Sequence, residues 1–421
     1  MQVFKFGGAS VKDAEAVINV GRILKKHAQQ PTVVVVSAMG KVTNKLEELV
    51  KAYFFKTPNI MEVFEEVKKY HFDIVKKLIP NLSNPIYNDL ENVFLEMLWA
   101  IEELPAFTFN HHYDQIVSLG EVLSTKIVSA YLNQIGITNQ WIDARGIIQT
   151  DNTYREGKVD YELSEKILQD QLQPLLKKNR IVITQGFIGG TSENYTTTLG
   201  REGSDYTASL LAYFLNAERV IIWKDVPGVL NADPKYFKNT QKLKELTYHD
   251  AIELTYYGAS VIHPKTIKPL QNKGIPLFVR SFLKPEEEGT VIKESDQRLN
   301  VTSYIFKTDQ ILISIQPKDF SFIAEDNLSN IFAIFSKHGV KVNMMQNSAI
   351  SFSVCVDEDD FKIKPLIEEL QFQFKVLYNQ NVQLMTIRNY DNDIVNKLSE
   401  NKVVLMEQKS RNTHQMVIKS E

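Results

Sequence analysis

The stretch from Thr196 to Thr207 holds residues suited to binding an anion. It reads Thr-Thr-Thr-Leu-Gly-Arg-Glu-Gly-Ser-Asp-Tyr-Thr, follows an apolar run and leads directly into a segment with helical spacing. This order predicts a strand, a polar loop with two glycines and the start of a helix. Amide groups at a helix start attract anions, and Arg201 adds a planar cation that grips two oxygens. A hydroxyl-rich surface loop, with Ser204 or Asp205 capping the helix, is the simpler alternative.

A second pattern of this kind lies near the start of the chain. Lys5 ends a short strand, and Gly7, Gly8 and Ser10 come directly before a helix predicted over residues 12–27. A lysine in this place can meet an anion held at the helix N-terminus. A lysine at a strand edge followed by a tight turn is the alternative.

Polar residues also follow the next elements of the chain. The apolar strand 32–36 runs into Ser37, and Glu121 lies at the start of a helix predicted over residues 122–134. A glutamate in a first turn is ordinarily a partner of the helix dipole. In an open α/β sheet, however, ligands bind beyond the carboxyl ends of the strands, so we expect successive loops of this kind to converge on one crevice.

The elements that position these loops alternate between strand and helix up to a charged stretch that ends near residue 297. This alternation predicts the α/β class, with an open, mostly parallel sheet and helices on both faces. Between residues 45 and 105 the pattern is helical with breaks at prolines, and we interpret it as a helical insertion. The pair His111 and His112 lacks a third ligand at a suitable spacing, so a loop or core position is favoured over a metal site.

The pattern changes after residue 297 to short β–α–β units. Strand, helix, strand, strand, helix and strand are predicted between residues 309 and 381, which would make one complete α+β unit. A second, abbreviated unit would combine residues 300–308 with residues 382–421, because its closing helix is missing from the pattern. We therefore predict a first domain over residues 1–297 and a second region over residues 298–421.

Composition restricts the partners. The 421 residues include 48 Lys and Arg against 51 Asp and Glu, and the formal charge of −3 gives no electrostatic reason to expect nucleic acid or an anionic membrane. The single cysteine, Cys355, excludes an internal disulfide and suits a reducing cytoplasm. No apolar run reaches the roughly 20 residues that span a bilayer, and no signal-peptide pattern precedes the first strand. We expect a cytoplasmic protein with small-molecule partners.

The motifs, taken together and in order, resemble those of aspartate kinase, a member of the amino-acid kinase superfamily with C-terminal ACT-type regulatory domains. The matching segments are Lys5–Val11, Ser37, Gly120–Glu121, Gln185–Gly189, Thr196–Arg201, Gly203–Thr207, Trp223, Asp225–Gly228, Asp233–Pro234, Gly258–Ala259 and His263–Pro264. The resemblance implies an amino-acid kinase fold followed by a smaller α+β ACT-type region.

The resemblance also implies the reaction. ATP and magnesium would phosphorylate the side-chain carboxylate of L-aspartate to 4-phospho-L-aspartate, the first step toward lysine, threonine and methionine. That carboxylate, with a reference pKa near ~4, is already ionised at neutral pH, so no general base is needed. A sister kinase acting on glutamate or acetylglutamate is one alternative, and a non-catalytic amino-acid sensor is another.

Individual roles follow from the resemblance. The catalytic positions would be Lys5, Gly8, Ser37 and Asp205. Aspartate would lie against Ser10, Glu121, Arg201, Gly203 and Ser204, with Glu121 at its α-ammonium and Arg201 at its α-carboxylate. The nucleotide would contact Lys5, Gly7, Gly8, Lys224, Asp225, Val226, Gly228, Asp233, Tyr236 and Ser260. No residue is assigned as a metal ligand, because magnesium would be held mainly through the nucleotide phosphates.

Three positions depart from the family pattern. The family usually has threonine where this chain has Ala9, and its central loop often has glycine where Glu202 stands. Many members have lysine at the position of Ser260. We expect a neighbouring base, Lys224 or Lys265, to compensate for that missing cation.

Regulation is the last expectation that the resemblance supports. An effector, lysine first and threonine second, would bind at the seam of the ACT-type unit, near Glu325, Asp326, Asn327, Asn343 and Ser348. Edge strands of such units pair with another unit, so we expect a homodimer through this region or a larger assembly. If the abbreviated second unit has abolished regulation, the region would serve only assembly.

Overall fold

The computed structural model describes residues 1–259, 262–296, 300–319 and 321–420, and it divides into two compact units. The first unit consists of residues 1–229, 242–252 and 261–298. The second consists of residues 230–241, 253–260 and 299–421. Each unit is described by itself below, and the domain boundary predicted near residue 297 stays a prediction.

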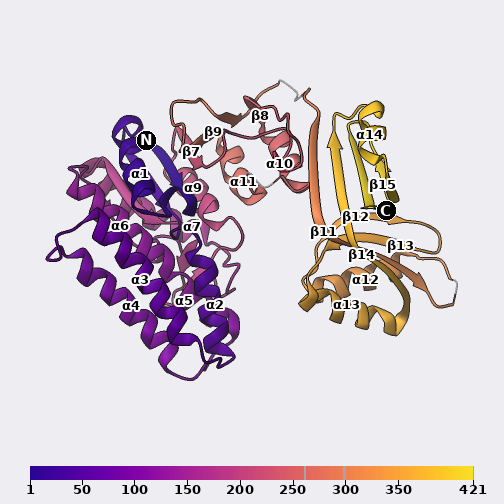
Figure 1. Ribbon diagram of the computed structural model, residues 1–421, viewed down its shortest axis with the longest axis horizontal. Coiled ribbons are helices and arrows are strands. Elements are labelled where there is room, and N and C mark those ends of the chain that lie inside the picture. The colour runs from indigo at the N-terminus through magenta and orange to yellow at the C-terminus, as the bar shows by residue number, and fades with distance from the viewer. Residues whose placement is uncertain (260–261, 297–299, 320, 421) are drawn as a thin grey trace. The chain divides into compact units, whose positions relative to one another are not determined.

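The first unit is built on an eight-stranded sheet with the order β3-β4-β2-β1-β7-β9-β10-β8. Three of these strands, β7, β8 and β9, are labelled in Figure 1. Its neighbouring strands pair in parallel except for β9 and β10. The strands are β1 (Gln2–Phe6), β2 (Thr32–Val36), β3 (Gln140–Trp141), β4 (Ile181–Gln185), β7 (Arg219–Lys224), β8 (Glu245–Thr247), β9 (Leu277–Ser281) and β10 (Thr290–Lys293). Every residue of β1, β2 and β4 is buried, as expected for strands covered on both faces. The predicted α/β class is confirmed.

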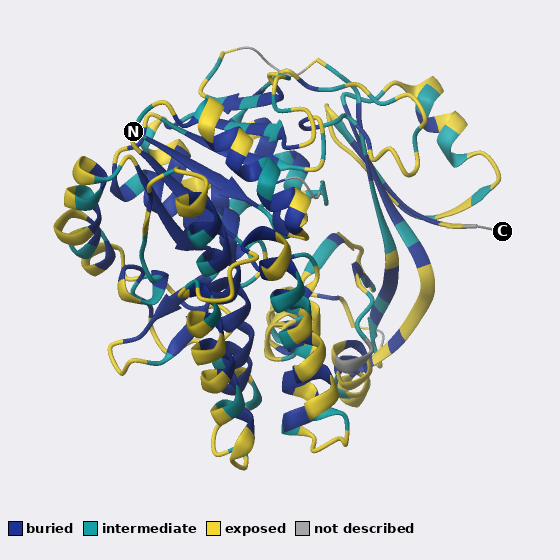
Figure 2. Ribbon diagram, turned by 60° about the vertical axis from the view of Figure 1, so that its left-hand side comes forward, coloured by how far each residue is buried: buried dark blue, intermediate teal, exposed yellow. Residues whose placement is uncertain are grey.

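Helices pack on this sheet, and one apolar core joins the sheet to the first six of them. They are α1 (Ala14–His27), α2 (Val42–Phe54), α3 (Ile60–Leu78), α4 (Ile86–Glu102), α5 (Phe109–Val117), α6 (Leu119–Gln134), α7 (Tyr161–Ile167), the π-helix Leu168–Leu172, α8 (Gln173–Lys178), α9 (Gly203–Phe214) and α11 (Pro264–Lys273), while α10 spans Tyr248–Tyr256. Figure 2 shows the strands buried and the outer helix faces exposed. The segment read as an insertion forms α2 to α4, and its buried Leu46, Val67 and Phe94 join the same core as Phe4 of β1.

The structure corrects several local predictions in this unit. Thr196–Thr198, interpreted as loop, forms strand β6 and pairs with β5 (Ile188–Gly190). Helix α9 begins at Gly203 after Glu202, so neither Ser204 nor Asp205 caps it. The helix predicted over residues 12–27 is observed as α1 over Ala14–His27, and a 3-10 turn over Gly8–Val11 precedes it. The π-helix separates α7 from α8, and α5 was not predicted.

The second unit contains a six-stranded sheet with the order β12-β13-β11-β14-β16-β15, in which neighbours pair antiparallel. Its strands and helices are β11 (Ser303–Pro317), α12 (Glu325–Lys337), β12 (Val342–Asn347), β13 (Phe352–Asp357), α13 (Asp360–Gln373), β14 (Phe374–Arg388), α14 (Asn392–Ser399), β15 (Lys402–Lys409) and β16 (Thr413–Ser420). Strands β11 and β14 each merge two strands that the sequence predicted separately. Irregular register near Lys307 and Gln310 and a positive φ of 55° at Asp309 allow this, so a local turn signal becomes a bulge.

Two apolar clusters lie on opposite sides of β11. Ile311, Ile313 and Ile315 share a core with residues of α12 and α13, whereas Leu312 packs with a second cluster that includes Cys355. Alternation along the strand produces this division. Cys355 is a buried free thiol, as predicted, and burial raises its pKa to about 12. It therefore packs as an apolar side chain.

Candidate active site

Three charged side chains form the centre of the candidate site. The Lys5 Nζ lies 2.7 Å from Oδ1 of Asp205, and the Lys224 Nζ lies 3.1 Å from Oδ2 of the same carboxylate. Strands β1 and β7 pair in parallel, which brings the two lysines to one edge of the sheet, while Asp205 comes from the first turn of α9. Burial alone would raise the pKa of Asp205, but the two ammonium groups lower it to about 2. The carboxylate is therefore ionised and holds both cations in place.

The loop after β1 has glycines because other backbone lies against it. A Cβ atom on Gly8 would lie 2.8 Å from the carbonyl oxygens of both Ala38 and Gly40, and one on Gly7 would lie 3.3 Å from the Lys5 Nζ. The amide of Gly40 donates to the carbonyl of Gly8 at 3.0 Å. This contact joins the loops that follow β1 and β2, as the sequence predicted for loops at the carboxyl ends of parallel strands.

Two serines complete this edge. The Ser10 hydroxyl is buried and donates to the carbonyl of Trp223, the residue before Lys224, at 3.3 Å. The amide of Ser37 donates to the carbonyl of Phe6 at 3.1 Å, which places Ser37 directly after the end of β2. The structure therefore gathers Ser10 and Ser37 with the two lysines at one edge of the sheet.

Glu121 is the second buried carboxylate near the site. Its Oε1 accepts from the amide of Ala38 at 3.2 Å, and Oε2 has no hydrogen-bond partner among the described residues. Burial raises the pKa of Glu121 to about 8, and the Ala38 amide and the charge of Lys5 oppose that rise only in part. A buried carboxylate oxygen without a protein donor suits a ligand cation.

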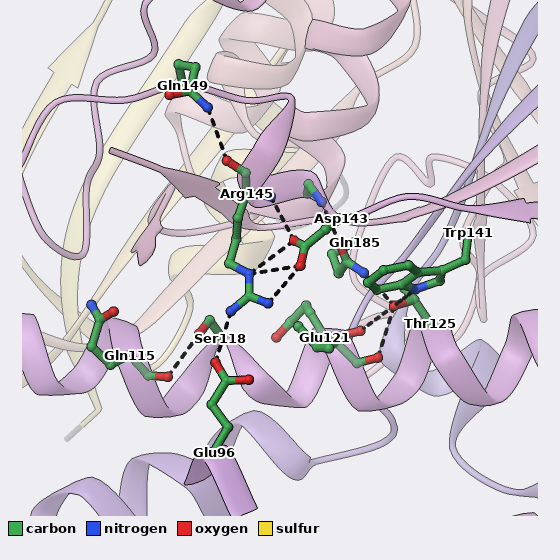
Figure 3. A network of polar contacts seen from close by, with 12 residues as sticks. Glu96, Gln115, Ser118, Glu121, Thr125, Trp141, Asp143, Arg145, Gln149 and Gln185 are labelled. Carbon is green, nitrogen blue, oxygen red and sulfur yellow. Dashed lines mark hydrogen bonds and ion pairs between the residues drawn. The ribbon is translucent and has the colours of Figure 1, made fainter. Parts of the chain in front are cut away.

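A polar network fixes the helix that carries Glu121 (Figure 3). The Thr125 hydroxyl donates to the carbonyl of Glu121 at 2.9 Å and accepts from Gln185 Nε2 at 2.8 Å and from Trp141 Nε1 at 3.0 Å. Gln185 ends β4, and its Oε1 accepts from the amide of Ala144 at 2.6 Å. Helix α6 is therefore tied to β3, β4 and the turn after β3, which holds Glu121 in one position.

The central loop approaches the rest of the site closely. A Cβ on Gly203 would lie 2.6 Å from the ring of Phe187, and one on Gly186 would lie 2.5 Å from the Cβ of Ser204. These contacts hold the start of α9 against the segment that follows β4. The side chain of Arg201 is exposed and makes no ion pair or hydrogen bond with any other described residue. It is thus available to a ligand.

Asp114 is a site-forming residue that sequence reasoning missed. Asp114 lies in the largely buried helix α5. Its Oδ2 accepts from the amides of Arg155 at 2.8 Å and Thr198 at 2.9 Å, and its Oδ1 accepts from the Thr198 hydroxyl at 2.7 Å. Burial raises its pKa to about 6 against these donors. Its partners, Arg155 and Thr198, lie in other segments of the chain, so local spacing carried no signal for this role. Asp114 holds the strand that leads into the Arg201 loop.

We expect Asp114→Asn to loosen this strand. The new amide keeps the shape of the carboxylate but replaces one acceptor by a donor that faces backbone N–H groups, at a cost of about 1–3 kcal/mol. Thermal unfolding should show a lower midpoint, and the KM for aspartate should rise. Asp170→Asn, at an exposed position whose side chain makes no hydrogen bond or ion pair with another described residue, is the matched control. An Asp114→Asn protein with unchanged midpoint and KM would contradict this role.

The predicted nucleotide residues are divided between the two units. Gly228, with a φ of 142°, turns against Thr290, and exposed Asp225 and half-buried Val226 follow Lys224 in the first unit. Asp233 and Tyr236 belong to the second unit, where the Tyr236 ring stacks on Phe306 with a centroid separation of 5.6 Å. Ser260 lies outside the described residues. The nucleotide roles of these residues stay predictions.

Lys265, one of the two bases expected to compensate for Ser260, lies beside the central loop. Its Nζ would be 3.8 Å from a Cβ on Gly200, a residue with a φ of 76°. The other, Lys224, contacts Asp205. Both cations are thus close to the loop that carries Arg201.

The predicted effector residues are divided between two places in the second unit. Glu325 and Asp326 are exposed in the first turn of α12, and the amide of Ile323 donates to the carbonyl of Ala349, next to Ser348. The fifth residue, Asn343, lies near the other end of β12.

The Asn343 side chain is engaged there. Its Oδ1 accepts from Lys307 at 2.8 Å, and its Nδ2 donates to Gln310 at 2.8 Å and to Asp357 at 2.9 Å. At about 3.3 Å per strand residue, Asn343 is roughly 16 Å from Ser348. The structure thus brings Asn327 and Ser348 toward the same loop and leaves Asn343 apart.

Outside the catalytic edge, the pair His111 and His112 is buried among aromatic rings, as expected for core histidines. Among the described residues, no helix combines the length and apolar character that crossing a membrane requires.

The comparisons with known proteins agree with this geometry. The model of the amino acid kinase family matches residues 1–281. Lysine-sensitive aspartokinase 3 of Escherichia coli is 30% identical over 400 residues, which cover 92% of this chain and 87% of the relative. The crystal structure of E. coli aspartokinase III in complex with aspartate and ADP, in the R-state, is 27% identical with a TM-score of 0.87 and covers 99% of this chain and 96% of its own. The structure of that enzyme with lysine and aspartate, in the T-state, is also 27% identical with a TM-score of 0.82, and covers 99% and 95%. The chain belongs to the aspartokinase family.

Proposed function

We propose that this protein transfers the terminal phosphoryl group of ATP to the side-chain carboxylate of L-aspartate. The observation that carries the proposal is the Lys5–Asp205–Lys224 cluster at the carboxyl ends of β1 and β7. Two ammonium groups on one buried carboxylate, beside a glycine loop, suit a phosphate chain. The related E. coli enzyme has been solved with aspartate and ADP, which supports the same pair of ligands here.

The charges of the substrate match the remaining residues. Glu121 would accept the α-ammonium of aspartate, and Arg201 would bind the α-carboxylate through two parallel hydrogen bonds. These two contacts define an amino-acid zwitterion. An acetylated substrate has no ammonium group, so the buried Glu121 disfavours acetylglutamate.

The phosphoryl step needs alignment and neutralisation rather than proton transfer. The attacking carboxylate is already ionised, so the residues must hold two anions in line while their repulsion is cancelled. Lys5 would neutralise charge on the transferring phosphate, and the backbone of Gly7 and Gly8 would allow close approach. Magnesium, when bound, supplies further neutralisation. Because both oxygens of Asp205 already contact lysines, we expect the nucleotide phosphates to hold the metal.

A hydroxamate assay of the purified protein tests this function. With ATP and magnesium, aspartate should give acyl phosphate, whereas glutamate and acetylglutamate should give little. Preference for either of the latter would reassign the substrate. A protein that binds aspartate but shows no turnover would instead be an amino-acid sensor.

Regulation by lysine is the finer part of the proposal. The E. coli relative is lysine-sensitive by name, and its T-state structure holds lysine. Here the exposed acidic pair Glu325 and Asp326 at the start of α12 suits the side-chain ammonium of lysine, while the helix amides suit its carboxylate. Residues 309–381 would form the ACT-type unit and residues 300–308 with 382–421 the abbreviated one. Strand β12 is a sheet edge, which favours a homodimer. A cytoplasmic location fits the free Cys355.

Lysine is expected to inhibit the wild type, and Asp326→Ala is expected to raise the inhibitory concentration of lysine about tenfold. A change of this size is typical of the coupling free energy between two sites. Inhibition curves with lysine and threonine provide the measurement. Glu368→Ala, which removes an exposed acidic residue from α13, should leave them unchanged. If neither amino acid binds or inhibits, the second unit serves assembly only.

A further inference from the structure

Glu202 has an unusual backbone conformation at the edge of the candidate site. It directly precedes α9 with φ 55° and ψ 26°, in the left-handed region that glycine adopts without crowding. Its side chain makes no capping hydrogen bond to the helix. A glutamate is thus held in an unfavourable conformation without serving as a helix cap, and its side chain must be explained by other contacts.

The Glu202 carboxylate is directed to the lysine that we expect to contact the nucleotide. Its Oε2 lies 3.5 Å from the Lys224 Nζ, which also lies 3.1 Å from Oδ2 of Asp205. Asp205 also binds Lys5. The four groups therefore form a chain of two ammonium groups and two carboxylates with no net charge.

The four charged side chains of this cluster differ in their freedom to move. The side chain of Asp205 is fully buried and that of Lys224 is 17% exposed, whereas that of Glu202 is 33% exposed. Asp205 also holds Lys5, so it cannot leave without freeing two cations. Burial and the neighbouring Asp205 raise the pKa of Glu202, and the ammonium of Lys224 opposes this rise, so the lysine favours the ionised carboxylate. Glu202 is the member that an incoming anion can displace.

We propose that Glu202 is an internal competitor of the nucleotide, which holds Lys224 in the free enzyme and is displaced from it by the phosphates of ATP or ADP. This inference rests on the proposed function, because it requires Lys224 to contact the nucleotide. A carboxylate and a phosphate beside the same ammonium repel each other, so the two contacts exclude one another. Glu202 would weaken nucleotide binding and, by returning to Lys224, would favour the release of ADP.

Calorimetric titration with magnesium-ADP tests the proposal without requiring turnover. Glu202→Gln removes the charge and keeps the size, and Glu202→Gly removes the side chain and suits the left-handed backbone. Both should lower the Kd for ADP by about threefold to tenfold, as expected for the loss of a partly exposed ion pair. Added salt should narrow the difference in Kd between the wild type and the Glu202 variants, because salt screens the partly exposed pair of Glu202 and Lys224.

Glu156→Gln is the matched control. Glu156 is exposed, and its Cγ would lie 3.4 Å from a Cβ on Gly200, so it alters the charge beside the same loop without contacting Lys224. It should leave the Kd unchanged. If Glu156→Gln lowered the Kd for ADP as much as the Glu202 variants do, the effect would come from the general charge near the loop, and the proposal would be overturned.

The remaining outcomes separate this inference from the proposed function. Suppose that the wild type phosphorylates aspartate and that both Glu202 variants bind ADP no more tightly than the wild type does. This result would overturn the inference alone and make Glu202 a residue that positions Lys224. A wild type that binds no ADP would overturn the proposed function, and this inference with it.

Discussion

Replacing Lys5 with methionine is expected to lower kcat by about a thousandfold, with a smaller effect on the KM for aspartate. Lys5 is fixed by Asp205 at 2.7 Å beside the glycine loop, so its charge meets the phosphate without reorganisation. Removing one preorganised group that stabilises developing charge costs about 10²–10³ in kcat. Fixed-time or steady-state assays at saturating aspartate and ATP measure the loss of kcat.

Stability must be separated from catalysis in this test. Lys5→Met leaves the buried Asp205 with one fewer cation, and breaking a buried ion pair costs roughly 3–5 kcal/mol. The double variant with Asp205→Asn removes the stranded charge and should recover much of the unfolding midpoint without recovering kcat. Lys12→Ala, at an exposed position on the same loop, should change neither. Near wild-type kcat in Lys5→Met would move the phosphoryl role to another cation.

The parallel sheet and its ligand edge could be predicted from local patterns. Apolar strands such as Thr32–Val36 are followed at once by polar residues, and the topology of parallel strands brings such loops together. The contact of Gly8 with Gly40 shows that the loops after β1 and β2 meet. For the same reason Lys5 and Ser37 could be assigned to one site without knowledge of any contact.

Partners from distant segments could not be predicted in this way. Lys5 was expected to meet an anion at a helix N-terminus, but its ammonium contacts Asp205, and Gly8 begins a 3-10 turn that precedes α1. Asp114 was missed because its role depends on Thr198, which lies in another element. Local spacing does not encode which buried carboxylate will meet which donor.

Short or bulged strands were the other source of error. Strand β6 contains only three threonines, so it has no apolar alternation to distinguish it from a loop. In the second unit, the polar residues Asp309 and Asn381 have positive φ values of 55° and 56°, which are typical of turns. There they lie within the long strands β11 and β14, because sheet pairing on both sides continues past the irregularity.

The affinity for aspartate is expected to increase as pH rises toward about 8, because Glu121 must ionise to accept the α-ammonium. Burial raises its pKa to about 8, so at neutral pH the free protein holds Glu121 mostly protonated. Binding of the zwitterion would then release a proton. Below that pKa the apparent KM should fall up to about tenfold for each pH unit.

The stability of the folded protein should decrease as pH rises, whereas the affinity for aspartate increases. The pKa of Glu121 is raised from 4.5 to about 8, so its neutral form is favoured by folding. That contribution is complete below the unfolded pKa and is lost as pH rises through the folded pKa. The shift corresponds to roughly 5 kcal/mol between these limits. Unfolding midpoints of the wild type should therefore decline relative to those of Glu121→Gln as the solution becomes more alkaline.

Glu121→Gln separates this group from others that titrate in the same range. The variant keeps Asp114, with its pKa of about 6, and Glu202, so their effects cancel in the comparison with the wild type. Loss of a charged partner for the α-ammonium should raise the KM for aspartate by about 10- to 100-fold at alkaline pH. Its KM should no longer follow the ionisation near pH 8, and its unfolding midpoint there should exceed that of the wild type. A variant that kept the wild-type pH profile would remove Glu121 from the aspartate site, whatever its effect on stability.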